Sequence, residues 1–232
     1  MDWFASIDLY CERVGPAFWS EPFNAISNVA FLIVAFGAWH LARQRGNMDF
    51  FEGVVIVLAG LVGIGSFLFH TLANGWSELA DVIPIWSFVA CYVLLAIYRS
   101  TGENTLKTLR IGFIIATVIG VVFWFTSGDV TSEQDTTPAL LNGSMQYAPA
   151  LLALVLFAII TQIKKRAIRH HITAAAAVFL ASLVFRTVDI DVCSATGIGT
   201  HFMWHILNAT MIWLLLHALV KHMPPGGGAL RG

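Results

Sequence analysis

The chain has 232 residues, of which 57% are hydrophobic and only 12% are charged, and its formal net charge is −1. Soluble domains carry about 25% charged residues, so this chain has too few charges to cover its apolar surface in water. The composition excludes an ordinary soluble domain and indicates one integral membrane domain. The near-neutral charge gives no reason to expect a nucleic-acid partner.

Seven apolar stretches are long enough to cross a membrane, which takes roughly 20 residues per helix. The short connection at Asn74 and Gly75 predicts that the second and third stretches are antiparallel neighbours. Asn24 and Asn28 open the first stretch, and because amides are costly in lipid we expect them to face protein. The predicted fold class is an all-α integral membrane protein, a seven-transmembrane-helix bundle. Its spans lie at about 24–42, 53–73, 79–99, 108–126, 146–163, 171–188 and 199–220.

The sequence divides into three parts around these spans. Residues 1–23 are polar, and we expect them to form an ordered extracytoplasmic segment. Residues 24–221 make up the seven-helix domain. The Gly- and Pro-rich residues 222–232 are predicted to be a flexible tail. The longest connection, 127–144, is rich in Asp, Ser, Thr and Gly, and no pattern in it indicates chemistry.

The basic residues predict the orientation of the bundle, because they concentrate in cytoplasmic connections. They follow the odd-numbered spans, which places the N-terminus outside and the C-terminus in the cytoplasm, as an odd number of spans requires. Only Arg13 and Arg186 fall elsewhere. The residues that follow the pattern are Arg43, Arg45, Arg99, Lys107, Arg110, Lys164, Lys165, Arg166, Arg169, Lys221 and Arg231.

Five polar side chains lie at one depth in this topology, in the outer half of the membrane. Ser66 and His70 are four residues apart near the outer end of the second span, so they share a helix face. Asp81 lies at the outer start of the third span. His201 and His205, also four apart, lie in the first turns of the seventh span. We therefore expect these side chains to meet.

The residue types in this group are those of a zinc hydrolase. Catalytic zinc has three protein ligands plus a water, and His70, His201 and His205 supply three imidazoles. Asp81 is predicted to take the proton of the water and pass it to a leaving amine. Ser66 is predicted to donate a hydrogen bond to the metal-bound oxygen or to the developing oxyanion. A site inside a bilayer predicts a lipid substrate that carries an ester or an amide.

Structural interpretations stand beside this one. A lone intramembrane His more often makes a packing hydrogen bond than it binds a metal, and a Ser such as Ser66 in a Gly-rich span usually serves close helix packing. Arg186 is expected to form an ion pair with Asp189 and Asp191. The other histidines are expected at the cytoplasmic interface; they are His40, His170, His171, His217 and His222.

The cysteines leave two alternatives open. The topology places Cys11 and Cys193 outside, where disulfides persist, so a disulfide and two free thiols are equally compatible with the sequence. Cys91 lies within the third span and is expected to be a buried free thiol.

Three other classes of membrane protein compete with the hydrolase. A retinal protein needs a lysine within the seventh span, and none occurs before Lys221. A metal transporter needs ionisable residues along the whole depth of the membrane, whereas these lie near one face. A non-enzymatic seven-helix lipid receptor that retains a structural zinc stays as the alternative.

The motif GxxSxxxH, an Asp eleven residues after that His, and HxxWHxxN together resemble the alkaline ceramidase family. In this chain Ser66, His70, Asp81, His201 and His205 carry the motif. The resemblance extends over most of the chain. It implies a seven-span zinc amidase, in the same superfamily as the adiponectin receptors, that hydrolyses ceramide to a sphingoid base and a fatty acid. It also implies three His ligands to zinc, assisted by the Ser and the Asp.

The resemblance further implies a calcium site near the zinc, built from the N-terminal segment. Glu12 and Glu21 match two glutamates of the family, and Tyr10 replaces a Trp that offers its backbone carbonyl. The family's aspartate has no match at its position, although Asp8 lies one residue away, and Val14 replaces an Asn. Because calcium prefers six or more oxygens, we expect a site that is weak, that uses waters, or that is lost.

The compact size and short polar N-terminus look like those of bacterial relatives. The predicted location is the bacterial inner membrane, with the site toward the extracytoplasmic side. The expected partner is a membrane lipid, either ceramide or another N-acyl lipid, and the oligomeric state is left open. The family's cysteine pairing is in keeping with a Cys11–Cys193 disulfide.

Overall fold

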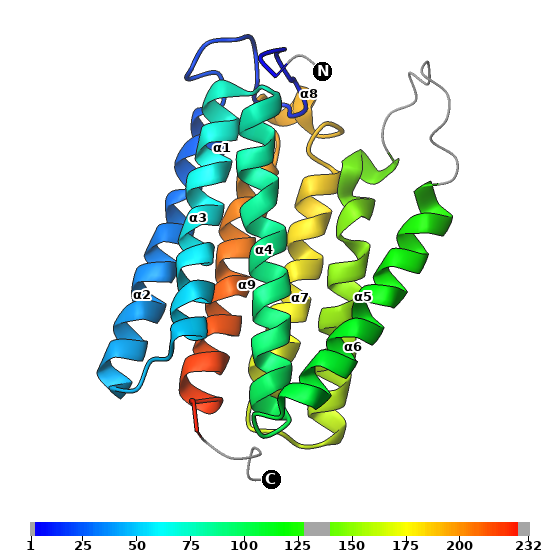
Figure 1. Ribbon diagram of the computed structural model, residues 1–232. Helices are drawn as coiled ribbons and strands as arrows, with labels where there is room; N and C mark the ends of the chain where they lie inside the picture. Colours follow the sequence, from blue (N-terminus) through cyan, green and yellow to red (C-terminus); the bar gives the residue numbers. More distant parts are fainter. Residues whose placement is uncertain (1–2, 128–139, 227–232) are drawn as a thin grey trace.

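The computed structural model describes residues 3–127 and 140–226, without the side chains of residues 118–119, 121–127 and 140 (Figure 1). Within this part of the chain the fold is a helical bundle without β-strands. The predicted connection 127–144 and tail 222–232 lie largely outside the described residues. The elements are α1 (Pro22–Ser27), α2 (Val29–Arg45), α3 (Phe50–Leu72), α4 (Gly75–Ser100), α5 (Thr105–Ser127), the 3-10 helix η1 (Leu140–Tyr147), α6 (Ala148–Ile163), α7 (Arg169–Thr187), α8 (Cys193–Thr196) and α9 (His201–His222).

Six helical segments in the described residues are long and apolar enough to cross a membrane. Each of them overlaps a stretch predicted from the sequence. The remaining predicted stretch, 108–126, coincides with the 23-residue helix α5. Because many side chains of α5 lie outside the description, seven spans stay a prediction. The six segments are Pro22–Arg45, Phe50–Leu72, Gly75–Ser100, Leu141–Ile163, Arg169–Thr187 and His201–His222.

Helix α9 lies at the centre of the bundle, packed against α2 and α7 and touching α1 and α3 (Figure 1). Its apolar side chains join those of α2, α3, α4 and α7 in one core cluster. Asn24 and Asn28 are 0% and 1% exposed, as their polarity predicts. The helix that carries the HxxWHxxN motif is therefore enclosed by protein along most of its length.

Helices α3 and α4 form the predicted antiparallel pair, and they approach each other closely at Gly65. A Cβ atom at Gly65 would lie 1.9 Å from the backbone oxygen of Ala80 and 3.2 Å from the Cα of Asp81. Asn74 ends the tight connection by accepting a hydrogen bond from the N–H of Ser77, which starts α4 with a capping box. The missing side chain of Gly65 thus brings Asp81 against α3.

Residues 3–21 cover the end of the bundle where α3 stops and α9 starts, which we call the capped end (Figure 1). The N–H of Ile7 donates to the oxygen of Ala73 over 2.8 Å. A disulfide joins Cys11 to Cys193, so this segment is tied to the turn that precedes α9. Residues 3–21 are thus held against the end of α3 and the turn before α9.

A buried ion cluster closes the opposite end. Glu52 is 0% exposed and accepts from Arg45 over 2.6 Å and from Arg99 over 3.0 Å. Arg45 also donates to the backbone oxygen of Val220 over 2.7 Å. A carboxylate this deeply buried has to be paired, and its partners fasten α2, α3 and α4 to the last turn of α9.

The variant Gly65→Ala is expected to lower the melting temperature of the protein in detergent, because the new Cβ forces α3 and α4 apart. Overpacking of this kind costs roughly 1–3 kcal/mol. The control is Gly53→Ala on the same helix, where a Cβ would meet no atom within 4 Å. Equal melting temperatures for the two variants would contradict the close approach.

Candidate metal centre

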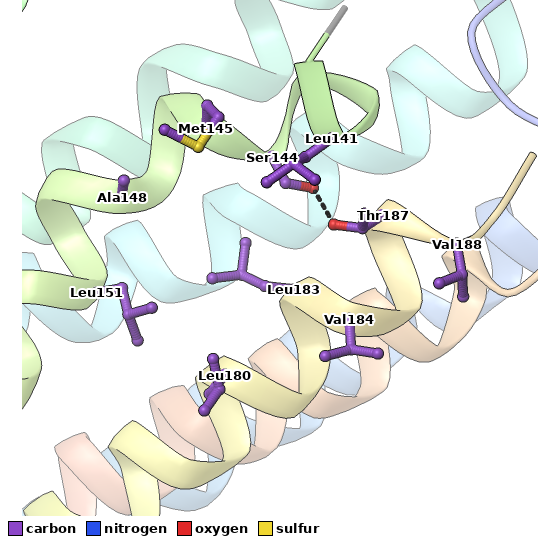
Figure 2. A pocket seen from close by; sticks show the side chains of 10 residues that line it. All are labelled: Leu141, Ser144, Met145, Ala148, Leu151, Leu180, Leu183, Val184, Thr187 and Val188. Carbon is purple, nitrogen blue, oxygen red and sulfur yellow. Dashed lines mark hydrogen bonds between the residues drawn. The ribbon is translucent and has the colours of Figure 1, made fainter.

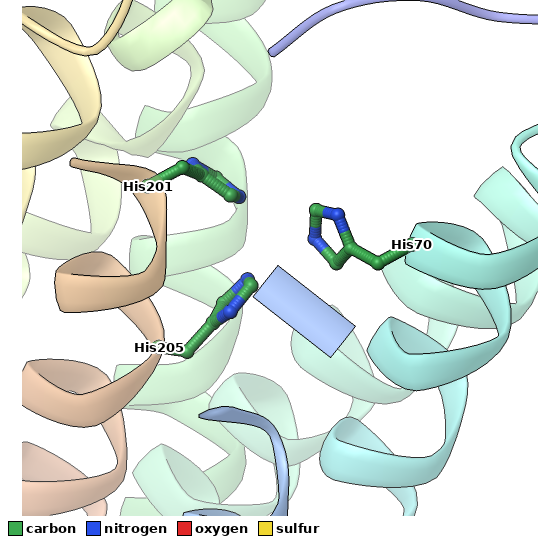
Figure 3. A group of neighbouring side chains, drawn as sticks. All are labelled: His70, His201 and His205. Atoms are coloured by element: carbon green, nitrogen blue, oxygen red, sulfur yellow. The ribbon is translucent and has the colours of Figure 1, made fainter. Parts of the chain in front are cut away.

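Three histidines from two helices face one another at the capped end (Figure 3). His70 lies in the last turn of α3, and His201 and His205 lie in the first turns of α9. One ring nitrogen from each side chain lies within 4.8 Å of the others. All three residues are at most 2% exposed. The convergence expected from their depth in the sequence is present.

Two of the rings are oriented by hydrogen bonds at their Nδ1 atoms. The Nδ1 of His70 lies 2.6 Å from the carboxylate of Glu21, and the Nδ1 of His205 lies 2.8 Å from the hydroxyl of Ser27. A carboxylate only accepts, so His70 carries a proton on Nδ1 and directs Nε2 away from Glu21. Such outer partners are typical of histidines that bind a metal.

The third ring, that of His201, is held by stacking and by the backbone. Its centroid lies 3.7 Å from that of Tyr10, at an interplanar angle of 19°. Its Nδ1 is buried and has no hydrogen-bond partner among the described residues. The carboxylate of Asp189 accepts from the N–H groups of Thr200 over 2.7 Å and of His201 over 2.8 Å. Asp189 thereby fixes the first turn of α9.

The predicted ion pair of Arg186 with Asp189 or Asp191 is wrong. Among the described residues no ion pair joins these side chains, because the two oxygens of Asp189 accept backbone N–H groups, including that of Cys11 over 3.0 Å. Arg186 instead donates to the hydroxyl of Tyr10 over 2.9 Å. Burial raises the pKa of Tyr10, so its hydroxyl stays protonated while it accepts this bond. Arg186 therefore supports the ring that stacks on the metal centre.

Ser66 and Asp81 complete the predicted group of five. Ser66 is 4% exposed, one turn before His70 on α3. The carboxyl of Asp81 on α4 interacts with the Ser66 side chain and lies within the electrostatic reach of His70. Its Oδ1 is buried and has no hydrogen-bond partner in the described structure. Asp81 thus offers a free acceptor beside the three histidines.

The N-terminal acidic residues have structural partners. The two oxygens of Glu12 accept from the N–H groups of Phe23 over 2.7 Å and of Asn24 over 2.8 Å, which caps α1. Burial raises the pKa of Glu12, and these two bonds lower it without cancelling the rise. Burial also tends to raise the pKa of Glu21, but its bonds with His70 and other partners hold that pKa below the usual value.

Arg13 is the second partner of Glu21. Its Nε pairs with the Glu21 carboxylate, and both side chains are 2% exposed. Its two other nitrogens donate to the backbone oxygens of Gly15 and His70, each over 3.0 Å. Arg13, Ser27 and Asp189 were not among the predicted site residues. Of these three, only Arg13 is marked in the sequence, because it does not follow the distribution of basic residues after the odd-numbered spans.

A separate apolar groove of about 300 Å³ lies between η1, α6 and α7 (Figure 2). One hydrogen bond crosses it, from the Thr187 hydroxyl to the Ser144 hydroxyl over 2.9 Å. The groove contains none of the predicted site residues. It is lined by Leu141, Ser144, Met145, Ala148, Leu151, Leu180, Leu183, Val184, Thr187 and Val188.

Comparison with known proteins gives one family. No curated protein matches the chain significantly. The sequence profile of the Ceramidase family matches residues 6–223, a range that contains all five converging side chains and the N-terminal segment from Ser6 onward. The chain therefore belongs to the Ceramidase family and is a multi-pass membrane protein.

Proposed function

We propose that the protein is an intramembrane zinc-dependent amidase, which hydrolyses the N-acyl bond of ceramide or a ceramide-like lipid to an amine base and a fatty acid. The observation that carries the proposal is the convergence of three buried histidine nitrogens within 4.8 Å in a chain of the Ceramidase family. The donor set fits zinc, because three imidazoles are a recurrent catalytic zinc site and leave one position open.

The residues around the histidines have separate roles in this proposal. Bound zinc would supply the Lewis acidity that activates water and polarises the amide carbonyl. Glu21 and Ser27 hold the rings of His70 and His205 in place through Nδ1. The unpartnered Oδ1 of Asp81 accepts the proton of the attacking water and returns it to the leaving nitrogen. The hydroxyl of Ser66 donates to the substrate oxygen as negative charge develops there.

The free acceptor also favours an enzyme over a lipid receptor with a structural zinc. A structural site would be complete with its ligands and their partners. Asp81 is not needed to hold any of the three rings, yet its Oδ1 is buried and has no hydrogen-bond partner among residues 3–127 and 140–226. A buried unsatisfied carboxylate oxygen is costly, and its presence beside a metal centre is explained by a proton-transfer role.

The orientation and location belong to the same proposal. The capped end holds the metal centre, and most basic residues flank helix ends on the opposite side. Since basic connections face the cytoplasm, the centre would lie on the extracytoplasmic side of a seven-span protein, in a bacterial inner membrane. The substrate would then come from the surrounding lipid.

The residues expected to bind calcium do not fit that ion. Glu12 caps α1, and Glu21 is shared by Arg13 and His70. The backbone oxygen of Tyr10 accepts from the N–H of Arg13, and Asp8 is exposed. Calcium prefers six or more oxygens, whereas the Arg13 guanidinium pairs with the Glu21 carboxylate and repels a cation. We propose that Arg13 supplies the positive charge here and that the protein does not depend on calcium.

The variant His205→Ala is expected to lose bound zinc and amidase activity, because it removes one of three ligands. The measurement combines metal analysis of purified protein with release of fatty acid from ceramide. His40→Ala, an exposed histidine on α2, is the control and should keep both. A His205→Ala protein that loses no zinc relative to His40→Ala would refute the ligand assignment.

The variant Asp81→Asn is expected to keep zinc but to lower kcat by roughly 10²–10⁴-fold, the usual contribution of a general acid–base group. Glu78→Gln changes an exposed carboxylate one turn earlier on α4 and should keep near wild-type turnover. If the two variants have the same kcat, Asp81 has no proton-transfer role.

Added calcium is expected to leave fatty-acid release unchanged, and purified protein should not retain radioactive calcium in equilibrium dialysis. The physical reason is the buried ion pair of Arg13 with Glu21. Stoichiometric calcium binding that disappears in Glu21→Gln would show that the ion displaces Arg13, contrary to this expectation.

A further inference from the structure

A second group of three histidines lies at the opposite end of the bundle from the metal centre. His171 lies near the start of α7, and His217 and His222 lie in the last turns of α9. One ring nitrogen from each lies within 4.8 Å of the others. Figure 1 places these ends of α7 and α9 away from the N-terminal segment. The sequence assigns these residues one by one to the membrane interface and does not predict that they meet.

The three rings pack on one another. His171 and His217 are stacked, with centroids 5.0 Å apart and an interplanar angle of 18°. The ring of His222 lies 5.0 Å from that of His171 and 6.1 Å from that of His217. Rings this close would repel one another if they were all protonated. They are compatible as neutral imidazoles, which is the state that binds metals.

The hydrogen bonding of this group is incomplete. The Nε2 of His171 and the Nδ1 of His217 are 3.1 Å apart, which satisfies one donor and one acceptor. The other nitrogen of His171, Nδ1, is buried and has no partner in the described structure. All three residues are half-buried, so an ion can reach them from solvent.

We propose that His171, His217 and His222 form a second metal site, which binds a divalent transition ion such as Zn²⁺. Imidazole donors favour zinc, copper and nickel, and the group contains no carboxylate that would favour calcium or magnesium. The three ligands come from two helices, so a bound ion ties the start of α7 to the end of α9. The site uses no residue of the proposed catalytic centre.

The role of this ion is structural. Helix α9 carries His201 and His205 at its start and His217 and His222 at its end. Among the described residues no carboxylate belongs to the second cluster, so it has no counterpart of Asp81. An ion that binds only the folded protein stabilises it by mass action, so zinc should raise the melting temperature through this site.

The test counts zinc bound per chain by metal analysis after incubation with Zn²⁺ and removal of free ion. The wild-type protein is expected to hold two equivalents, and His217→Ala to hold one fewer. His222→Gln changes the last residue of α9, which is half-buried, and serves as the second variant where His217→Ala fails to fold. His170→Ala, an exposed neighbour of His171, is the matched control and should equal the wild type.

The variant His70→Ala separates the two sites. It lacks a ligand of the catalytic centre, so its remaining equivalent should disappear when His217→Ala is added. Zinc should raise the melting temperature of His70→Ala but not that of the double variant. If the wild-type protein holds one equivalent of zinc and only the second-cluster variants lose it, the second site is supported and the proposed catalytic zinc is refuted. If His217→Ala and His222→Gln bind as much zinc as His170→Ala, the second site is overturned.

Discussion

The carboxylate of Glu21 is the group on which the metal centre depends most. It is 2% exposed and contacts Arg13, the Nδ1 of His70 and the side-chain amide of Asn24. An ionised carboxylate cannot stay in such a place without partners, so the charge fixes where the N-terminal segment, α1 and α3 lie relative to one another. The same contacts set the tautomer of His70. One buried charge thus positions both the N-terminal segment and the ring of His70.

The other two histidines of the candidate metal centre depend on how α9 is held at its ends. At its start, Asp189 accepts the N–H groups of Thr200 and His201, and through Cys11 it also binds the N-terminal segment. At its end, Arg45 donates to the oxygen of Val220, and Arg99 donates to that of Met223. A helix end leaves backbone groups unpaired, and here charged side chains from distant segments supply the partners. The candidate centre is therefore built on a helix that is fixed at both ends, which suits a site that needs accurate geometry.

The sequence predicted those features of the site that depend on helical periodicity and on depth in the membrane. His201 and His205 share a face because they are four residues apart, and the orientation of the spans brings His70 and Asp81 to their depth. The sequence did not predict contacts between residues that are far apart in the chain and that no periodicity relates, such as the hydrogen bond between Ser27 and His205.

Two of the wrong or missing assignments have the same physical origin. The sequence predicts that Arg186 pairs with the acids nearest to it, but Asp189 instead accepts backbone N–H groups at the start of α9. His171 was treated alone, because its partner His217 lies 46 residues away on another helix. The charge pattern did contain a usable signal. Arg13 and Arg186 are the basic residues that break it; both are buried, Arg13 against the backbone of His70 and Arg186 against Tyr10, which stacks on His201.

On the proposal that Arg13 supplies the positive charge beside Glu21, the candidate metal centre should respond to its surroundings differently from a centre with calcium there. A calcium ion at this position would bind and leave with the calcium concentration, and its loss would leave Glu21 without a counter-charge. A guanidinium in the chain is always charged and cannot dissociate. It also adds directed hydrogen bonds to Gly15 and to the backbone of His70, which a spherical ion could not direct in this way. On this proposal the link between the N-terminal segment and His70 does not depend on the calcium concentration, because Arg13 is part of the chain.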